Sequence, residues 1–536
     1  YGYIYSGINV PMTEQRGTVI LVVARESVIG LDYELARLHS DLIGDGWRVI
    51  RHDVSRNDTP QSVRALIMND FYTDPANVNT VFLLGHVPIL HSGYMDYDGH
   101  GARAMPADAY YGEVFNDWPT APASSPSYLP SDVNLMVGRV DLANMPGKGA
   151  ANPWPNETEL LRRYLNKDHL WRHGQISVGR WALMGNRRGD EAGLATAASG
   201  YRNFEPLVGP GRTVEANINN TAPADRRWIS LLTTGRYLWA YGCGAGQDTG
   251  VSYLGHHGPY AEVWSTDIVG FDAQAVFVMF FGSYLGNWDR ADNIMRAVLA
   301  TPSVGLASCM AGQPHWFFHH MGLGETIGYS TRLTMNNQGL YKNQSNPYAR
   351  AVFIALMGDP TLRMEPIAPA ANLNATVSST GVYLSWSPST APGAGYHVYR
   401  ATSSDGPFTR LTGEAVSATA FTDSTASPNT YTYMVRAVTL VSNPSGSYYN
   451  PSQGVFTTCT VEPVAPPMMV QVSPSPAGLA LTWNSQAGVT YRVQAATDLA
   501  QPTWLDISGY LQGTGPSTSW TDSSVSGHRF YRVVSP

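Results

Sequence analysis

VFVMFFGSYLG, residues 276–286, and YLWAYGCGAG, residues 237–246, are the two stretches of the sequence that decide the fold. Each is a run of apolar residues that stops at a glycine and continues into small or polar residues. Continuous apolar runs are typical of strands buried on both faces of a parallel sheet. Open α/β sheets bind ligands outside the carboxyl ends of their strands. The residues that follow these two runs are therefore where we expect a functional site.

The first part of the chain repeats this pattern, with helices between the strands. Residues 18–24 (TVILVVA) form an apolar run, after which Leu31, Leu35, Leu38 and Leu42 recur at helical spacing. Alternating strands and helices predict right-handed crossovers and an α/β fold, a mainly parallel sheet with helices on both faces. Further strands are predicted at residues 47–52, 80–85, 135–140, 177–184, 237–241, 275–281 and 304–310.

The composition changes after a Pro/Ala linker at residues 368–372. VYLSW (382–386) and YTYMVRA (431–437) then alternate at period two between turns rich in Ser, Thr, Pro and Gly, which predicts a β-sandwich. This segment resembles a fibronectin type III module, and LALTW (479–483) begins a shorter copy. We expect three domains: an α/β domain at 1–367, a fibronectin type III-like sandwich at 372–460 and a second β-sandwich module at 465–536.

Composition also limits the partners. The net charge is −7, and no segment concentrates Lys and Arg, which argues against nucleic acid or an anionic membrane as a partner. No apolar run reaches the roughly 20 residues needed to span a bilayer. The three cysteines, Cys243, Cys309 and Cys459, lack metal-ligand spacing. Many aromatic residues and terminal sandwich modules are common in secreted bacterial enzymes, so we expect a secreted or cell-surface protein whose substrate is an extracellular polymer, glycan or protein.

Four short motifs occur in an order that is informative: FLLGHVP (82–88), PADAYY (106–111), VGRV (137–140) and LMGDPTLR (356–363). They are similar to four segments of gingipain-type cysteine peptidases. In the same order, these segments are a strand that ends in Gly and Pro before the first loop over the site, an Asp-x-x-Tyr segment, a strand that contains Gly-Arg, and the Gly-Asp-Pro segment at the end of the catalytic domain. Over residues 17–365 the chain resembles this family, and the resemblance implies a caspase-like fold.

The two strand ends depart from that family at both reactive positions. Gingipain-type enzymes carry Gly-His-Gly after one strand and Cys-x-x-Gly after the next, and the matching positions here hold Cys243 and Ser283. Peptide hydrolysis at such a site needs a thiolate and an imidazole that activates it. A thiol does not replace imidazole as a base near neutral pH, and a serine without an adjacent base is a poor nucleophile. We therefore predict that the peptidase dyad is absent.

Three accounts of this exchange stay open. In the leading one, a crevice between the two strand ends serves another hydrolytic or lytic reaction, with carbohydrate favoured over peptide as the substrate. Asp248 and Asp289 follow the two strands, and paired carboxylates act as acid and base on glycosidic bonds. The residues expected to bind substrate are Gln247, Asn287, Trp288, Tyr284, His86, His315 and Trp316, with Tyr241 as a further stacking face.

In the second account Cys243 is itself the nucleophile of a cysteine peptidase and a histidine from a neighbouring loop activates it. The histidines considered are His86, His256, His257, His315, His319 and His320. In the third account the protein is a catalytically silent extracellular binding protein.

Structural roles compete with each of these chemical roles. Cys243, between glycines, is also a small residue suited to a tight turn. Ser283 and Asp289 precede a predicted helix, so either could cap it, and Asp289 lies nearer the helix start. These structural roles and the chemical roles both stay open.

Metal binding has little support in the sequence. His315 and His319 are four residues apart, but Pro314 and the absence of a Glu between them argue against a zincin-type site, so no cofactor is predicted. Three aspartates surround Gly99-His100-Gly101. They suggest a structural calcium ion or loop hydrogen bonds, or else a loop that faces the substrate. The aspartates are Asp96, Asp98 and Asp108.

Overall fold

The computed structural model describes residues 2–145, 147, 154–187, 197–217, 223–337, 339, 348–378, 380–462, 468 and 470–535. The chain divides into two compact units, Tyr1–Val461 and Glu462–Pro536. Among the described residues, none of the helices has the length and apolar character that crossing a membrane requires.

A ten-stranded sheet lies at the centre of the first unit. Its strand order is β3 (Trp47–Val54), β2 (Gly17–Ala24), β4 (Val78–Leu84), β5 (Met136–Val140), β14 (Leu356–Gly358), β13 (Ala307–Met310), β12 (Ala275–Phe281), β8 (Tyr237–Cys243), β6 (Ala182–Asn186) and β7 (Thr213–Glu215). Neighbours are parallel except β13 and β14, which pair antiparallel. The predicted mainly parallel sheet is confirmed, and its antiparallel pairing involves the three-residue strand β14.

Two strands begin several residues later than predicted. The strand predicted at 177–184 begins only at Ala182, the first residue to pair with β7 and β8. The side chain of the preceding Arg180 contacts Glu365 and the carbonyl of Ser442. The strand predicted at 304–310 begins at Ala307. The short strands β7 and β14 were not predicted, since three residues carry no readable periodicity.

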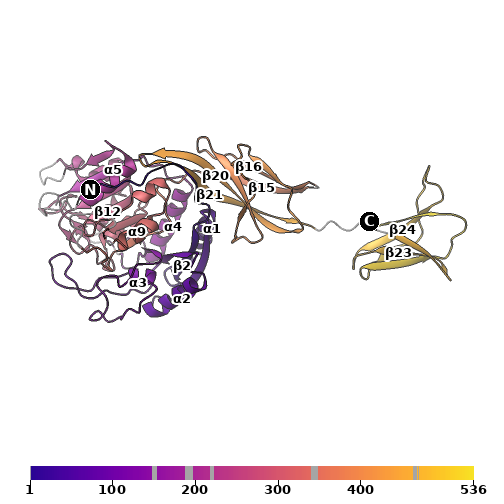
Figure 1. Ribbon diagram of the computed structural model, residues 1–536, viewed down its shortest axis with the longest axis horizontal. Coiled ribbons are helices and arrows are strands. Elements are labelled where there is room, and N and C mark those ends of the chain that lie inside the picture. Colours follow the sequence, from indigo (N-terminus) through magenta and orange to yellow (C-terminus); the bar gives the residue numbers. More distant parts are fainter. Residues whose placement is uncertain are drawn as a thin grey trace. The chain divides into compact units, whose positions relative to one another are not determined.

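Helices connect the strands (Figure 1). They are α1 (Asp32–Gly44), α2 (Pro60–Thr73), α3 (Ala109–Gly112), α4 (Glu157–Arg172), α5 (Ala198–Val208), α6 (Trp228–Thr234), α7 (Ser265–Gly270), α8 (Ile294–Ala300) and α9 (Ile327–Met335), with 3-10 turns η1 (Ala224–Arg226) and η2 (His319–Leu323). Leu35, Leu38 and Leu42 of α1 are buried, as their spacing predicts. Helix α4 begins where the Asn156 side chain accepts a hydrogen bond from the Glu159 amide, an N-cap arrangement.

Residues 371–461 form a β-sandwich. One sheet contains β15 (Ala371–Ser378), β16 (Gly381–Ser387) and β19 (Ala420–Asp423), and the other contains β17 (Gly395–Ala401), β18 (Thr409–Arg410), β20 (Asn429–Asn443) and β21 (Gly446–Val461). Trp386 and Tyr433 lie in the core between them. A strand that the sequence did not reveal, β1 (Gly7–Val10), pairs parallel with β21. The N-terminal residues therefore extend the sandwich.

Buried charged side chains lie where α1 meets the first sandwich; α1 lies beside β21 in Figure 1. Arg363 donates to Asn450 Oδ1 at 2.6 Å and to Asp45 Oδ1 at 3.2 Å. Arg172 of α4 donates to Asp45 Oδ2 at 2.5 Å. Of these contacts, the one between Arg363 and Asn450 of β21 reaches the sandwich, and because an unpaired buried charge is costly it helps to hold the two parts together.

The second unit is a smaller sandwich. One sheet contains β22 (Val470–Ser475), β23 (Gly478–Asn484) and β27 (Ser517–Asp522), and the other contains β24 (Thr490–Ala496), β25 (Leu505–Asp506), β26 (Leu511–Gln512) and β28 (Phe530–Val534). Leu481, Trp483, Tyr491 and Val493 form its core. The start predicted at residue 465 lies outside the described residues.

Candidate functional site

The ends of β8 and β12 lie side by side, as the sequence predicts. The two strands pair parallel, with Cys243 opposite Phe281. Gly282 and Ser283 continue directly from β12, so both exchanged positions lie at the carboxyl edge of this half of the sheet. Open α/β sheets bind ligands at such an edge.

The turns after these strands pack directly on each other. The Gly244 amide donates to the Phe281 carbonyl at 3.1 Å. A Cβ atom added to Gly246 would lie 2.5 Å from the Ser283 carbonyl oxygen, and one added to Gly282 would lie 2.9 Å from the Gly246 Cα. Backbone therefore fills the space between the turns, and the predicted crevice between them is wrong. The short strands β9 (Gly246–Gln247), β10 (Gly250–Val251) and β11 (Val263–Trp264) continue beyond the first turn.

Cys243 is completely buried, with 0% of its surface exposed. Of the histidines considered as its partners, His256 contacts the Ser230 hydroxyl at 2.8 Å and His257 contacts Asp267 at 2.7 Å. A substrate cannot reach the Cys243 thiol in this conformation. The packing role that its sequence context suggests is the one that this geometry favours.

Ser283 has an imidazole partner. Its Oγ lies 3.0 Å from Nε2 of His100, whose ring stacks on Tyr284 with centroids 5.0 Å apart and planes at 18°. The prediction that Ser283 lacks an adjacent base is therefore wrong. His100 lies in the segment between β4 and β5, nearly two hundred residues from Ser283, and only its place in a predicted loop could have pointed to it.

Asp98 fixes the His100 loop onto the end of β12. Its carboxylate accepts hydrogen bonds from the Tyr284 amide at 3.1 Å and from the Arg103 guanidinium at 3.0 and 2.5 Å. Burial acts to raise the pKa of Asp98, but the hydrogen bonds from Arg103 and the Tyr284 amide outweigh it, and the pKa is lowered. Arg103 also lies over the Tyr284 ring, 4.6 Å from its centroid. Asp98 is thus held as a carboxylate that ties the two segments together.

Tyr284 adopts a left-handed backbone conformation, with φ at 65°. This region is uncommon for residues other than glycine, and residues held in such sparsely populated conformations cost about 1–3 kcal/mol and cluster at functional sites. The strained residue immediately follows Ser283. It turns the chain sharply at the end of β12, which supports a hypothesis of function for this corner.

The two predicted catalytic carboxylates lie nearby and have different surroundings. Asp289 contacts His91 Nε2 at 2.9 Å, and Asp248 accepts a hydrogen bond from Asn287 at 3.2 Å. Burial raises the pKa of Asp248. At Asp289 burial acts in the same direction, but the hydrogen bond and charge of His91 outweigh it and lower the pKa. Asn293, not Ser283 or Asp289, caps α8.

Several residues predicted to bind substrate have no open face. Trp288 and Trp316 are each 1% exposed and Tyr241 is 0% exposed. Trp288 lies under Arg139, and the Trp316 indole donates to the Met310 carbonyl at 2.8 Å. These three rings are core residues, so they do not enter the proposed site.

The other predicted binding residues are dispersed. Gln247 donates to Glu262 at 3.4 Å, and His86 contacts Asp141 at 2.8 Å at the carboxyl ends of β4 and β5. Asp141 also lies 3.6 Å from Arg296 in the first turn of α8, the helix that follows β12, so the His86–Asp141 pair is on the same side of the sheet as the start of α8. Burial lowers the pKa of His315 to about 4, so this ring is neutral at physiological pH.

Two of the aspartates around Gly99-His100-Gly101, where a structural calcium ion was considered, form ion pairs with arginines. Asp98 is paired with Arg103 and Asp108 with the buried Arg139. In the part of the chain that the structure describes, these aspartates do not converge as a cluster of metal ligands. His315 precedes η2 and His319 begins it, so the two do not form a helical i, i+4 pair.

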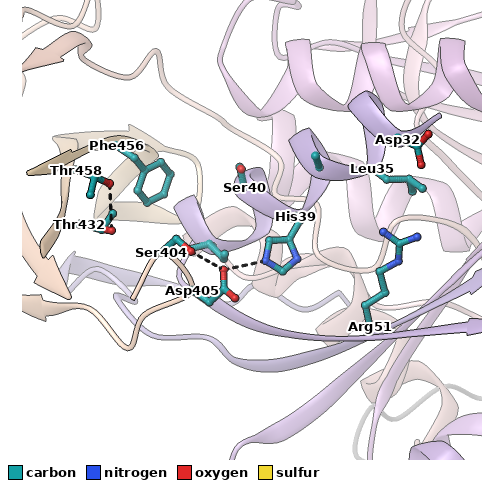
Figure 2. A pocket seen from close by; sticks show the side chains of 12 residues that line it. Asp32, Leu35, His39, Ser40, Arg51, Ser404, Asp405, Thr432, Phe456 and Thr458 are labelled. Carbon is teal, nitrogen blue, oxygen red and sulfur yellow. Dashed lines mark hydrogen bonds and ion pairs between the residues drawn. The ribbon is translucent and has the colours of Figure 1, made fainter. Parts of the chain in front are cut away.

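A cavity of about 490 Å³ lies between α1 and the first sandwich (Figure 2). His39 of α1 contacts Asp405 at 3.2 Å within it, and Phe456 and Thr458 line the opposite side. None of the candidate site residues at the ends of β8 and β12 lines this cavity.

Comparison with solved structures shows that the chain has a gingipain-like fold. The crystal structure of gingipain R, described as an Arg specific cysteine proteinase, matches 84% of this chain and 100% of its own with a TM-score of 0.52 at 11% identity. At this identity the likeness concerns the fold alone.

Smaller matches fall on β-sandwich proteins. An Fn3-like protein from Clostridium thermocellum is 29% identical over 17% of this chain and 92% of its own, with a TM-score of 0.14. A two-domain fibronectin type III segment of chicken tenascin is 13% identical over 31% of this chain and 99% of its own, with a TM-score of 0.18. No protein-family model and no curated protein matches the chain.

Proposed function

We propose that this protein is a hydrolase in which Ser283 is the nucleophile and His100 the general base, acting on a peptide or ester bond of an extracellular polymer. The single observation that carries this assignment is the 3.0 Å contact between Ser283 Oγ and His100 Nε2. A nucleophile within hydrogen-bond reach of an imidazole is the arrangement that activates serine. The gingipain-like fold supports the same class of reaction at this edge of the sheet.

The reaction follows from that geometry. His100 Nε2 accepts the hydroxyl proton as Ser283 Oγ attacks the substrate carbonyl carbon, and the imidazolium then protonates the leaving amine or alcohol. Water, deprotonated by the same imidazole, hydrolyses the acyl-enzyme and restores the serine. Stacking on Tyr284 orients the His100 ring, and Asp98 holds its loop.

Chemical rescue tests the role of His100. The wild type, Ser283→Ala, His100→Gly and a control, His39→Ala, are assayed on p-nitrophenyl acetate and on a casein substrate. We expect the first two variants to lose activity, added imidazole to restore part of it in His100→Gly only, and the control to match the wild type. His39 is a suitable control because it contacts Asp405 beside the distant cavity and not Ser283. Activity that persists in Ser283→Ala would exclude Ser283 as the nucleophile.

Cleavage of a polysaccharide by Asp248 and Asp289 is the second candidate. The observation that favours it is the opposite displacement of their pKa values, raised at Asp248 and lowered at Asp289, which is the pattern of an acid and base pair. It predicts chain cleavage of a polysaccharide that Asp248→Asn and Asp289→Asn abolish and Ser283→Ala leaves intact. A panel of polysaccharides scored for new reducing ends separates the two candidates. For both candidate functions, we predict that the protein is secreted or displayed at the cell surface.

A further inference from the structure

Three side chains that commonly bind metals meet between α1 and α4, away from the site described above. Asp41 Oδ2 lies 2.7 Å from Nδ1 of His169, and Asp41 Oδ1 lies 2.9 Å from Nε2 of His173. One donor atom from each of the three residues lies within 4.8 Å of the other two. Among the described residues, this is the one group of three or more His, Cys, Asp or Glu side chains with that spacing.

Local sequence explains how the group is built. His169 and His173 are four residues apart at the end of α4, so both project from one face of the helix. Their ring centroids are 4.1 Å apart. Asp41, in the last turns of α1, faces them across the contact between the two helices. The sequence spacing His-x-x-x-His is the signal that could have identified this pair.

The group is open on one side. The Asp41 side chain is 6% exposed, whereas those of His169 and His173 are 22% and 16% exposed. Part of each histidine side chain is therefore in contact with solvent, and water can complete the coordination of an ion bound there. Three protein ligands with an open position are a common zinc arrangement.

We propose that Asp41, His169 and His173 bind a transition-metal dication, and that the ion is Zn²⁺. Two imidazoles and one carboxylate are donors that suit zinc, whereas Ca²⁺ and Mg²⁺ favour sets made of oxygen atoms. Ligands at about 2.0–2.2 Å from one ion lie about 3.0–3.5 Å apart. The two Asp41–histidine separations therefore need to widen by less than about 1 Å, and a donor separation of up to 4.8 Å needs to shorten by about 1–2 Å. The ring nitrogens that face Asp41 must then present lone pairs, and each neutral imidazole carries its proton on the other nitrogen.

The position of the group suggests what the ion does. Gln453 of the first sandwich donates to the Asp41 backbone carbonyl at 2.9 Å. An ion bound here ties α4 to α1 at the point where α1 contacts β21. It acts as a clamp that stabilises the joined α/β domain and sandwich.

Zinc titration of the tag-free full chain tests this assignment. The chain is stripped with a chelator and titrated with Zn²⁺ by calorimetry, with Mg²⁺ and Ca²⁺ in parallel, and Co²⁺ is added to follow its visible absorption. We expect one equivalent of Zn²⁺ to bind, a rise in melting temperature that the chelator reverses, and no binding of Mg²⁺ or Ca²⁺. His169→Gln, His173→Gln and Asp41→Asn should each weaken Zn²⁺ binding by at least about 100-fold. This loss is larger than the one usually seen when a residue that only hydrogen-bonds to a metal ligand is removed.

The His52–Asp70 pair supplies the matched control. His52 Nε2 lies 2.6 Å from Asp70 Oδ2 at a comparable half-buried position, but it belongs to no group of three ligands in the described chain. His52→Gln should bind Zn²⁺ as the wild type does. Circular dichroism of each metal-free variant establishes that it is folded, and the Co²⁺ spectrum reports ligation independently of stability. Absence of saturable Zn²⁺ binding by the wild type, or equal binding by folded His169→Gln and His173→Gln, would overturn the assignment.

Discussion

Removing the charge of Asp98 tests whether the His100 loop activates Ser283. In Asp98→Asn the side chain keeps its shape but loses the ion pair with Arg103, which involves contacts of 3.0 and 2.5 Å. The Asp98 and Arg103 side chains are 9% and 20% exposed, so solvent screens the pair only in part. Hydrogen bonds to charged groups contribute about 1.5–3 kcal/mol, and an amide oxygen retains some of that bonding.

We therefore expect the ordered position of the loop to lose about 2 kcal/mol. Since 1.4 kcal/mol corresponds to a factor of ten, the fraction of molecules with His100 on Ser283 falls by up to about 30-fold. The assay is the second-order rate constant for phosphonylation of Ser283 by a fluorophosphonate, which requires an activated hydroxyl. The rate constant should fall by a similar factor, while the melting temperature changes little because the loop lies at the surface.

Asp132→Asn is the control, because Asp132 also pairs with an arginine, Arg350, but its side chain is 59% exposed, whereas that of Asp98 is 9% exposed. Its rate constant should equal that of the wild type. An unchanged rate in Asp98→Asn would refute the idea that the loop positions the base. A loss of the same size in Asp132→Asn would show that the effect is not specific to the loop.

Three further predictions concern packing, thiol reactivity and pH. Gly246→Ala should destabilise the fold by about 1–3 kcal/mol in urea unfolding, because the added Cβ would lie 2.5 Å from the Ser283 carbonyl oxygen. The control Gly270→Ala, whose added Cβ would have no atom within 4 Å, should be neutral or stabilising, and equal effects of the two variants would contradict the packing described. A thiol reagent should modify Cys459 before the buried Cys243 and Cys309 in the native protein, and Cys243→Ala should keep its activity; rapid native labelling of Cys243 would restore the cysteine peptidase account. Burial lowers the pKa of His315 and His319 to about 4, below the unfolded value of about 6.5, so the stability they contribute is fully present above pH 6.5 and is lost as the pH drops toward 4. Urea unfolding midpoints that do not fall between pH 7 and pH 4.5, or a pH dependence of these midpoints that is unchanged in His315→Gln, would contradict this.

The sheet could be predicted because its strands are long apolar runs. The strands that end at Cys243 and Phe281 were identified as neighbours from the sequence, and the structure pairs them. Their turns could not be predicted, because the approach of Gly246 to Ser283 depends on three-dimensional packing. The sequence suggested an open crevice between the two turns, but the backbone of residues 244–246 contacts that of residues 281–283.

The partner of Ser283 was missed for a different reason. His100 reaches it from a long connection between β4 and β5, whose path no periodicity specifies. The aromatic residues were misjudged because sequence alone does not separate a core indole from an exposed one, and Trp288 proves to be buried. The antiparallel pairing of β13 with β14 was not predicted, because β14 is a strand of only three residues.

The most direct measurement is the site at which a fluorophosphonate reacts with the native protein. We predict a single adduct on the peptide that contains Ser283, found by mass spectrometry after digestion, and none in His100→Ala. Unmodified protein at reagent concentrations that label trypsin, or an adduct on another serine, would contradict an activated Ser283.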